Sequence, residues 1–147
     1  GRRGGGGAPP PPGTSVLICD TLGELPSLYG LCRVAFVGAS LVPLGGHNLL
    51  EAARAGCAVV HGPSMDHFAA AADSLGRSAP PAACLVHDEV ELASFVHRQL
   101  ANEVLHLRTR RAALRTAKTL AADVLQDVCN LVALPLRITG LVATGSG

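Results

Sequence analysis

The chain has 147 residues, of which 48% are hydrophobic, 16% are charged and only 3% are aromatic, with no Trp. This composition suffices for one ordinary domain with a core of Ala, Val and Leu, as in parallel sheets buried under helices. A net charge of +1 argues against nucleic-acid binding, and no apolar run approaches the ~20 residues that a membrane-spanning helix needs.

Cysteine and histidine are scattered along the chain. The five Cys form no C-x-x-C pair, and the six His have no clustered Cys or carboxylate partners. We therefore expect reduced thiols and no structural metal.

The two ends differ in composition from the middle. Residues 1–14 read GRRGGGGAPPPPGT, which predicts a disordered linker without the apolar stretch of a signal peptide. Residues 15–132 are the predicted domain, and residues 133–147 are a predicted tail. Because the sequence also begins without Met, we expect a segment of a longer chain or an incomplete gene product.

The middle alternates short β-rich runs with helical patterns. The candidate strands are residues 16–19, 34–37, 58–61 and 83–86. Each precedes a candidate helix, at residues 25–32, 47–55, 67–75 and 89–100. This order predicts an α/β fold with a single Rossmann-like parallel sheet and helices on both of its faces.

A long amphipathic helix is predicted from Asn102, which is a plausible N-cap. It carries a basic cluster of Arg108, Arg110, Arg111, Arg115 and Lys118. We expect this cluster to be a solvated helix face in preference to a lipid headgroup patch, although peripheral contact with a membrane stays open.

The most informative segment is VGASLVPLGGHNLLE at residues 37–51, which predicts a strand, a glycine loop and a helix that begins near His47. Gly45 and Gly46 would leave the backbone bare before a helix N-terminus, where N–H groups and the helix dipole favour a phosphate. Ser40 follows the strand, and ligands of open α/β sheets bind at that edge. We therefore expect these residues to converge on one crevice.

Within that predicted helix, His47 and Asn48 lie one turn from Glu51. The Glu51 carboxylate could accept hydrogen bonds from the two hydroxyls of a ribose. Alternatively, His47 and Asn48 cap the helix while Glu51 stabilises its first turn. Spacing alone leaves both interpretations open.

Two further loops follow candidate strands. DTLGEL at residues 20–25 contributes Asp20, Gly23 and Glu24, which are also ordinary residues for a turn before a helix. HGPSMDHF at residues 61–68 contributes His67, a candidate donor to a sugar carboxylate or phosphate, although a lone His is more often structural.

Together and in this order, the three segments resemble the C-terminal domain of 3-deoxy-D-manno-octulosonic acid (Kdo) transferases. The family patterns D-T-x-G-E-L, V-G-G-S-L-x-P-x-G-G-H-N-x-x-E and G-P-x-x-x-[NH]-F are similar to residues 20–25, 37–51 and 62–68. The likeness covers roughly residues 16–132 and is closest to plant members.

The resemblance implies the C-terminal half of a GT-B glycosyltransferase that transfers Kdo from CMP-Kdo to lipid A precursors, without another cofactor. It predicts a donor-binding site that contains Asp20, Gly23, Glu24, Ser40, Gly45, Gly46, His47, Asn48, Glu51 and His67. Ala39 stands where the family usually has Gly, and we expect its methyl group to crowd the nucleotide.

In this family the general base is a glutamate of the N-terminal domain, for which the chain has neither length nor motif. The resemblance therefore predicts donor binding without catalysis by the chain alone. It also implies a mitochondrial location for a plant protein, or the cytoplasmic face of the inner membrane for a bacterial one. The alternatives are a non-catalytic nucleotide-sugar binding module, another GT-B enzyme and a sugar-nucleotide epimerase.

Overall fold

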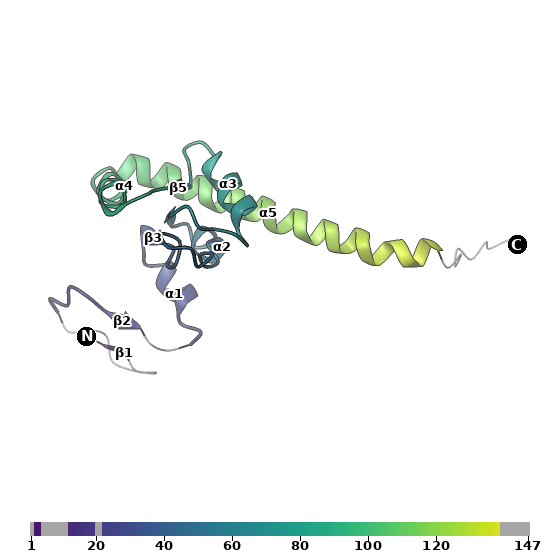
Figure 1. Cartoon of the computed structure of the whole chain (residues 1–147), viewed down its shortest axis with the longest axis horizontal. Helices are drawn as coiled ribbons and strands as arrows, with labels where there is room; N and C mark the ends of the chain where they lie inside the picture. Colours follow the sequence, from purple (N-terminus) through teal and green to yellow (C-terminus); the bar gives the residue numbers. More distant parts are fainter. Residues whose placement is uncertain (1, 4–11, 20–21, 139–147) are drawn as a thin grey trace, which may run out of the picture.

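The structure is a computed structural model of the chain, and it describes residues 2–3, 12–19 and 22–138. The strands are β1 (Arg2–Arg3), β2 (Ile18–Cys19), β3 (Val34–Phe36), β4 (Ala58–His61) and β5 (Ala83–Leu85). The helices are α1 (Leu25–Tyr29), α2 (Leu50–Arg54), α3 (Ala69–Gly76), α4 (Glu89–Ala101) and α5 (Glu103–Ile138). Figure 1 shows this order along the chain.

The central sheet is parallel, with strand order β3-β4-β5. Val34 pairs with Ala58, and Val59 pairs with Ala83. Because all three strands run in the same direction, the loops that follow them meet at one edge of the sheet. The predicted α/β class and three of the four predicted strands are confirmed.

Helices cover both faces of the sheet, as predicted. Side chains of the central strand β4 alternate between the two faces, as the pleat of a strand requires. Val59 belongs to the core formed with α2, α3 and α5, whereas Ala58 and Val60 pack with Phe95 of α4 on the other face. All four residues of β4 are buried, which explains its continuous apolar sequence.

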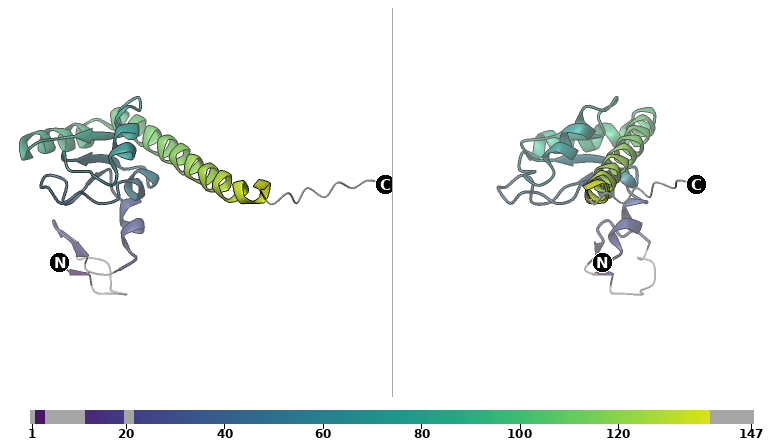
Figure 2. Two further views of the ribbon diagram at one scale, coloured as in Figure 1. Left: turned by 45° about the vertical axis from the view of Figure 1, so that its right-hand side comes forward. Right: turned by 90° about the vertical axis from the view of Figure 1, so that its right-hand side faces the viewer.

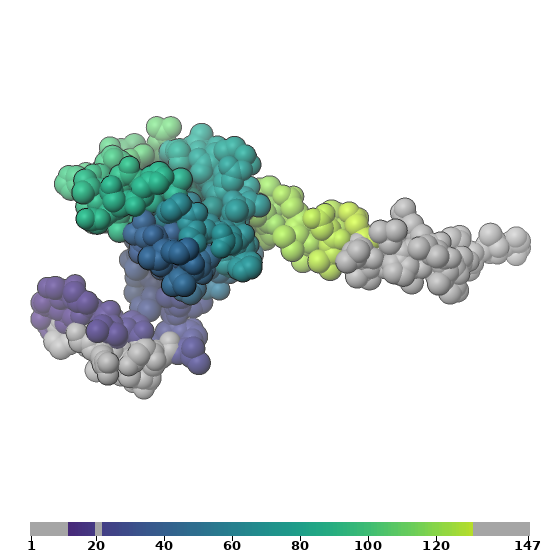
Figure 3. Space-filling model, in the orientation of Figure 1, coloured from purple at the N-terminus to yellow at the C-terminus, as the bar shows by residue number. Residues whose placement is uncertain are grey.

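The first part of α5 is the main support of the core. Ala112, Ala113 and Ala117 are almost completely buried in the cluster that includes α2 and α3. Their small side chains let the helix backbones approach closely. Residues 122–130 are all exposed, and Figure 3 shows this part of α5 extending beyond the body of the molecule.

One predicted strand does not join the central sheet. Residues 16–19 were expected to form its first strand, but only Ile18–Cys19 forms a strand, β2, and it pairs in parallel with β1. Both lie apart from the central sheet in two directions of view (Figures 1 and 2), and Ile18 is 53% exposed. The expectation was wrong because an apolar run predicts a strand without specifying its neighbour.

The domain boundaries drawn from composition differ from the ends of the elements. Arg2–Arg3, within the predicted linker, forms β1, whereas residues 4–11 lie outside the described residues. α5 continues to Ile138, past the predicted boundary at residue 132. In the described part of the chain, no helix is both long and apolar enough to cross a membrane.

Candidate functional site

A cavity of about 450 Å³ opens between α1, the end of β3 and α2. It brings together His47, Asn48 and Glu51, as the sequence predicted. The remaining lining residues are Leu25, Tyr29, Ala35, Phe36, Val37, Gly38, Leu49 and Ala52. The lining therefore combines mostly apolar residues with a few polar side chains, which is typical of small-molecule sites.

The helix beside this cavity begins later than predicted. α2 starts at Leu50, and the expected start at His47 is wrong. The cause is local, because the Asn48 Oδ1 accepts a hydrogen bond from the Leu50 N–H at 3.0 Å and closes a turn ahead of the helix. Gly45 and Gly46 thus lie in the loop, away from the helix N-terminus.

The glycine pair lets this loop pack closely against the loop after β4. Gly45 and Gly46 have φ of +84° and +65°, which favours glycine. The Gly45 N–H donates to Ser64 Oγ at 2.9 Å, so this group is not free for a phosphate. A Cβ on Gly46 would lie 2.5 Å from Met65 Sδ and 2.8 Å from the Ser64 carbonyl oxygen.

Ser40 joins the same two loops. Its side chain is completely buried, and its hydroxyl donates to the Val37 carbonyl at 2.5 Å and accepts from the Gly62 N–H at 2.8 Å. The Ser40 carbonyl accepts from the Ser64 N–H at 2.9 Å. Ser40 was predicted to contact the substrate; it does not line the cavity, and its hydrogen bonds hold the loops after β3 and β4 together.

Ala39 has a left-handed backbone, with φ of +60°, and no other non-glycine residue of the described ranges has a positive φ. L-residues pay a steric penalty there, because Cβ approaches the backbone carbonyl oxygen. Its carbonyl accepts a hydrogen bond from the Gly46 N–H at 3.4 Å. The backbone conformation thus explains why glycine suits this position.

Tyr29 is a cavity residue that the sequence analysis missed. Its pKa is raised, first by burial and then by the nearby Glu51 carboxylate, so the phenol stays protonated and can donate a hydrogen bond. The sequence could have indicated Tyr29, because it lies four residues, or one helical turn, after Leu25 at the end of the DTLGEL segment. Both residues line the cavity.

The other predicted site residues lie outside this lining. Gly23 has φ of +84° and open space around its Cα, which fits a turn. Glu24 precedes α1, and its carbonyl accepts hydrogen bonds from the Ser27 and Leu28 N–H groups at 3.1 and 3.2 Å. His67 is exposed, and Asp20 falls outside the described residues.

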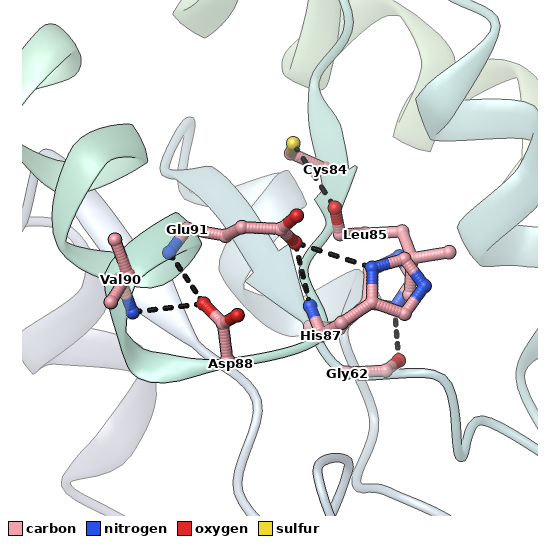
Figure 4. A network of polar contacts seen from close by, with 8 residues as sticks. Gly62, Cys84, Leu85, His87, Asp88, Val90 and Glu91 are labelled. Carbon is pink, nitrogen blue, oxygen red and sulfur yellow. Dashed lines mark hydrogen bonds and ion pairs between the residues drawn. The ribbon is translucent and has the colours of Figure 1, made fainter.

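A second polar cluster lies after β5 (Figure 4). Asp88 Oδ1 accepts from the Val90 and Glu91 N–H groups, and Glu91 Oε2 accepts from the His87 N–H at 2.8 Å. This reciprocal pattern is that of a helix cap, here for α4, so it does not require a ligand. Across the ranges that the structure describes, no group of His, Cys, Asp and Glu side chains is arranged to hold a metal ion.

Two curated relatives that match most of this chain are named as the same transferase. It is 34% identical over 122 residues to a probable mitochondrial 3-deoxy-D-manno-octulosonic acid transferase of Arabidopsis thaliana, covering 82% of this chain. It is 39% identical over 118 residues to a 3-deoxy-D-manno-octulosonic acid transferase of Bordetella pertussis, covering 76% of this chain. The chain spans 27% of the length of each relative.

A solved structure agrees with these relatives. The C-terminal CMP-Kdo binding domain of WaaA from Acinetobacter baumannii matches with a TM-score of 0.64 and 29% identity, over 70% of this chain and 53% of that one. No protein-family model matches the chain. The fold and the relatives define a domain of a glycosyltransferase. The chain belongs to the Kdo transferase family and corresponds to the C-terminal domain of its members.

Proposed function

We propose that this chain is the donor-binding part of a Kdo transferase and that it binds the nucleotide of CMP-Kdo in the cavity between α1, β3 and α2. The observation that carries the proposal is the convergence of His47, Asn48 and Glu51 on one cavity at the carboxyl edge of a parallel sheet. The likeness to a CMP-Kdo binding domain supports this choice of ligand.

Glu51 is the group we assign to the ribose. It is exposed in the first turn of α2 and lines the cavity, so its carboxylate is free to accept hydrogen bonds from two vicinal hydroxyls. Asn48 has its Oδ1 occupied by the Leu50 N–H, which leaves its amide N–H groups as donors for the ligand. The Tyr29 phenol, which lines the same cavity from α1, is a second donor.

We assign the phosphate of the ligand to the His47 imidazole and to the backbone of Gly46, the residue before it. His47 is exposed beside Gly38, whose missing side chain leaves room above the end of β3. The Gly46 N–H makes a long hydrogen bond, of 3.4 Å, to the Ala39 carbonyl, so it is held more weakly than the Gly45 N–H, which donates to Ser64 Oγ at 2.9 Å. Gly45, Ser40 and Ser64 then support this loop from behind.

Transfer of Kdo to a lipid A precursor would require more than these residues. Inverting transfer needs a general base within hydrogen-bond reach of the acceptor hydroxyl. The resemblance assigns this base to an N-terminal glutamate, and the matches cover 27% of the relatives' length. We therefore propose that the chain alone binds donor without transferring sugar, in mitochondria if it is a plant protein and at the cytoplasmic face of the inner membrane if it is bacterial.

Calorimetric titration with CMP and with UMP tests the choice of nucleotide. The proposal predicts saturable binding of CMP and weaker binding of UMP. Because the two ligands differ only in the base, the difference in affinity measures recognition of the base. Equal binding of both would instead favour a different nucleotide-sugar enzyme or a non-specific nucleotide module. Incubation with CMP-Kdo and a lipid A precursor should yield no transferred Kdo.

A further inference from the structure

The solvent face of α5 carries a continuous row of cations. Arg108, Arg111, Arg115 and Lys118 recur at intervals of three, four and three residues, which places them on one side of the helix. All four are exposed, whereas the buried face of the same helix carries Ala113 and its neighbours. We call this row the arginine stripe, and it spans about 15 Å of helix.

The arginine stripe lacks compensating charge. Residues 104–122 contain five cations and no acidic residue, although the whole chain has a net charge of only +1. None of the four side chains forms an ion pair with an acid in the described part of the chain; the recorded pairs involve Arg33, Arg77 and His87. Like charges three and four residues apart repel each other along a helix. An anion bound between them would remove this repulsion.

The stripe also has a shape that can hold an anion. Arg108, Arg111 and Arg115 line a cavity of about 250 Å³ whose other wall is Ala79 and Pro80. No carboxylate lines it, and the Pro80 carbonyl is already engaged by the Ser78 hydroxyl at 3.0 Å. Three guanidinium groups around a small cavity match the oxygen geometry of a phosphate group, which accepts paired N–H donors.

We propose that this cavity, the arginine groove, is a second ligand site that binds the phosphate group of a phosphate ester. It shares no lining residue with the cavity between α1, β3 and α2, so it does not depend on the proposed nucleotide site. A soluble phosphate ester and a phospholipid headgroup both carry this chemistry. The experiment therefore has one arm for each source.

The first arm measures binding of glycerol 3-phosphate, a soluble phosphate ester, to the 147-residue chain by calorimetry at low salt. The second measures flotation of the chain with phosphatidylcholine vesicles, with and without phosphatidylglycerol. The test variant is R108Q/R111Q/R115Q, and the matched control is R54Q/R77Q/R98Q, which removes the same charge elsewhere. Circular dichroism checks that both variants keep the helical fold.

The wild-type chain should bind in at least one arm, and the test variant should lose this binding by about tenfold or more while the control keeps it. Binding confined to soluble esters identifies a free phosphate ester as the ligand, and binding confined to anionic vesicles identifies a headgroup. Absence of binding in both arms, or equal losses in the two triple variants, would overturn the proposal.

Discussion

The Ser40 hydroxyl accepts a hydrogen bond from the Gly62 N–H at 2.8 Å and so joins the loop after β3 to the loop after β4. The two backbones are so close that a Cβ on Gly62 would overlap the Ser40 carbonyl group. This junction is buried and lies directly behind the segment that carries Gly45 and Gly46. The junction therefore fixes the loop that leads from β3 to His47, one of the residues that line the cavity.

Replacement of Ser40 by Ala should lower the free energy of unfolding by about 1–3 kcal/mol, because the buried Gly62 N–H would lose its partner. Urea denaturation measures the change. The control is Ser74→Ala in α3, where the hydroxyl bonds only to the Ala70 carbonyl near the surface and Ala favours the helix. A Ser40→Ala effect no larger than that of the control would show that the junction contributes little.

Ala39→Gly should stabilise the chain by about 0.5–1 kcal/mol. Glycine removes the left-handed strain at φ of +60°, and this gain exceeds the extra entropy of glycine in the unfolded state. The matched control is Ala93→Gly in α4, where the backbone is helical and glycine should destabilise by about 1 kcal/mol. Thermal unfolding of both variants distinguishes them by sign, and loss of stability in Ala39→Gly would contradict the account.

Gly38→Ala should weaken nucleotide binding without harming the fold. A Cβ there would meet His47 Cδ2 at 3.5 Å, an ordinary contact, yet it would project into the lining of the cavity. We expect stability within about 0.5 kcal/mol of the wild type and a loss of CMP affinity of about tenfold. Unchanged affinity would place the nucleotide away from the end of β3.

Cys57 should make stability fall at alkaline pH. Burial, followed by the nearby Cys32, raises the pKa of its thiol from 9.0 to about 11. Because the unfolded chain releases this proton first, the stabilisation is complete below pH 9.0 and is lost as pH rises to about 11, by about 2 kcal/mol. Urea denaturation across this range should show a smaller decline in Cys57→Ala than in Cys129→Ala, an exposed control. Equal declines would contradict the assignment.

The parts of the fold that follow from local pattern were predictable. Residues 58–61 were predicted as a strand, and all four residues of β4 are buried between the two helical layers. Asn102 was recognised as an N-cap, and its Oδ1 accepts from the Leu105 N–H at 2.9 Å. Convergence of His47 and Glu51 agrees with the sheet edge at which their segment begins, whereas the helical spacing expected between them does not apply because α2 begins only at Leu50.

Other features were not predictable, some for local and some for non-local reasons. Asn48 was a plausible cap, but its turn moves the start of α2 to Leu50, which composition does not reveal. The positive φ of Ala39 has no signal in a single sequence, because alanine rarely adopts it. The task of Ser40 depends on Gly62, which is 22 residues away. Such pairings require the arrangement of the strands to be known.

The most direct test of the account is the effect of Glu51→Gln on CMP affinity, measured by calorimetry beside Glu89→Gln. Both glutamates lie in the first turn of a helix, but only Glu51 lines the cavity between α1, β3 and α2. We predict that Glu51→Gln weakens CMP binding by about tenfold or more, because the ribose loses hydrogen bonds to a charged carboxylate. Glu89→Gln should bind CMP like the wild type. Absence of CMP binding by the wild-type chain, or equal affinities in the two variants, would contradict the assignment of this cavity as the donor site.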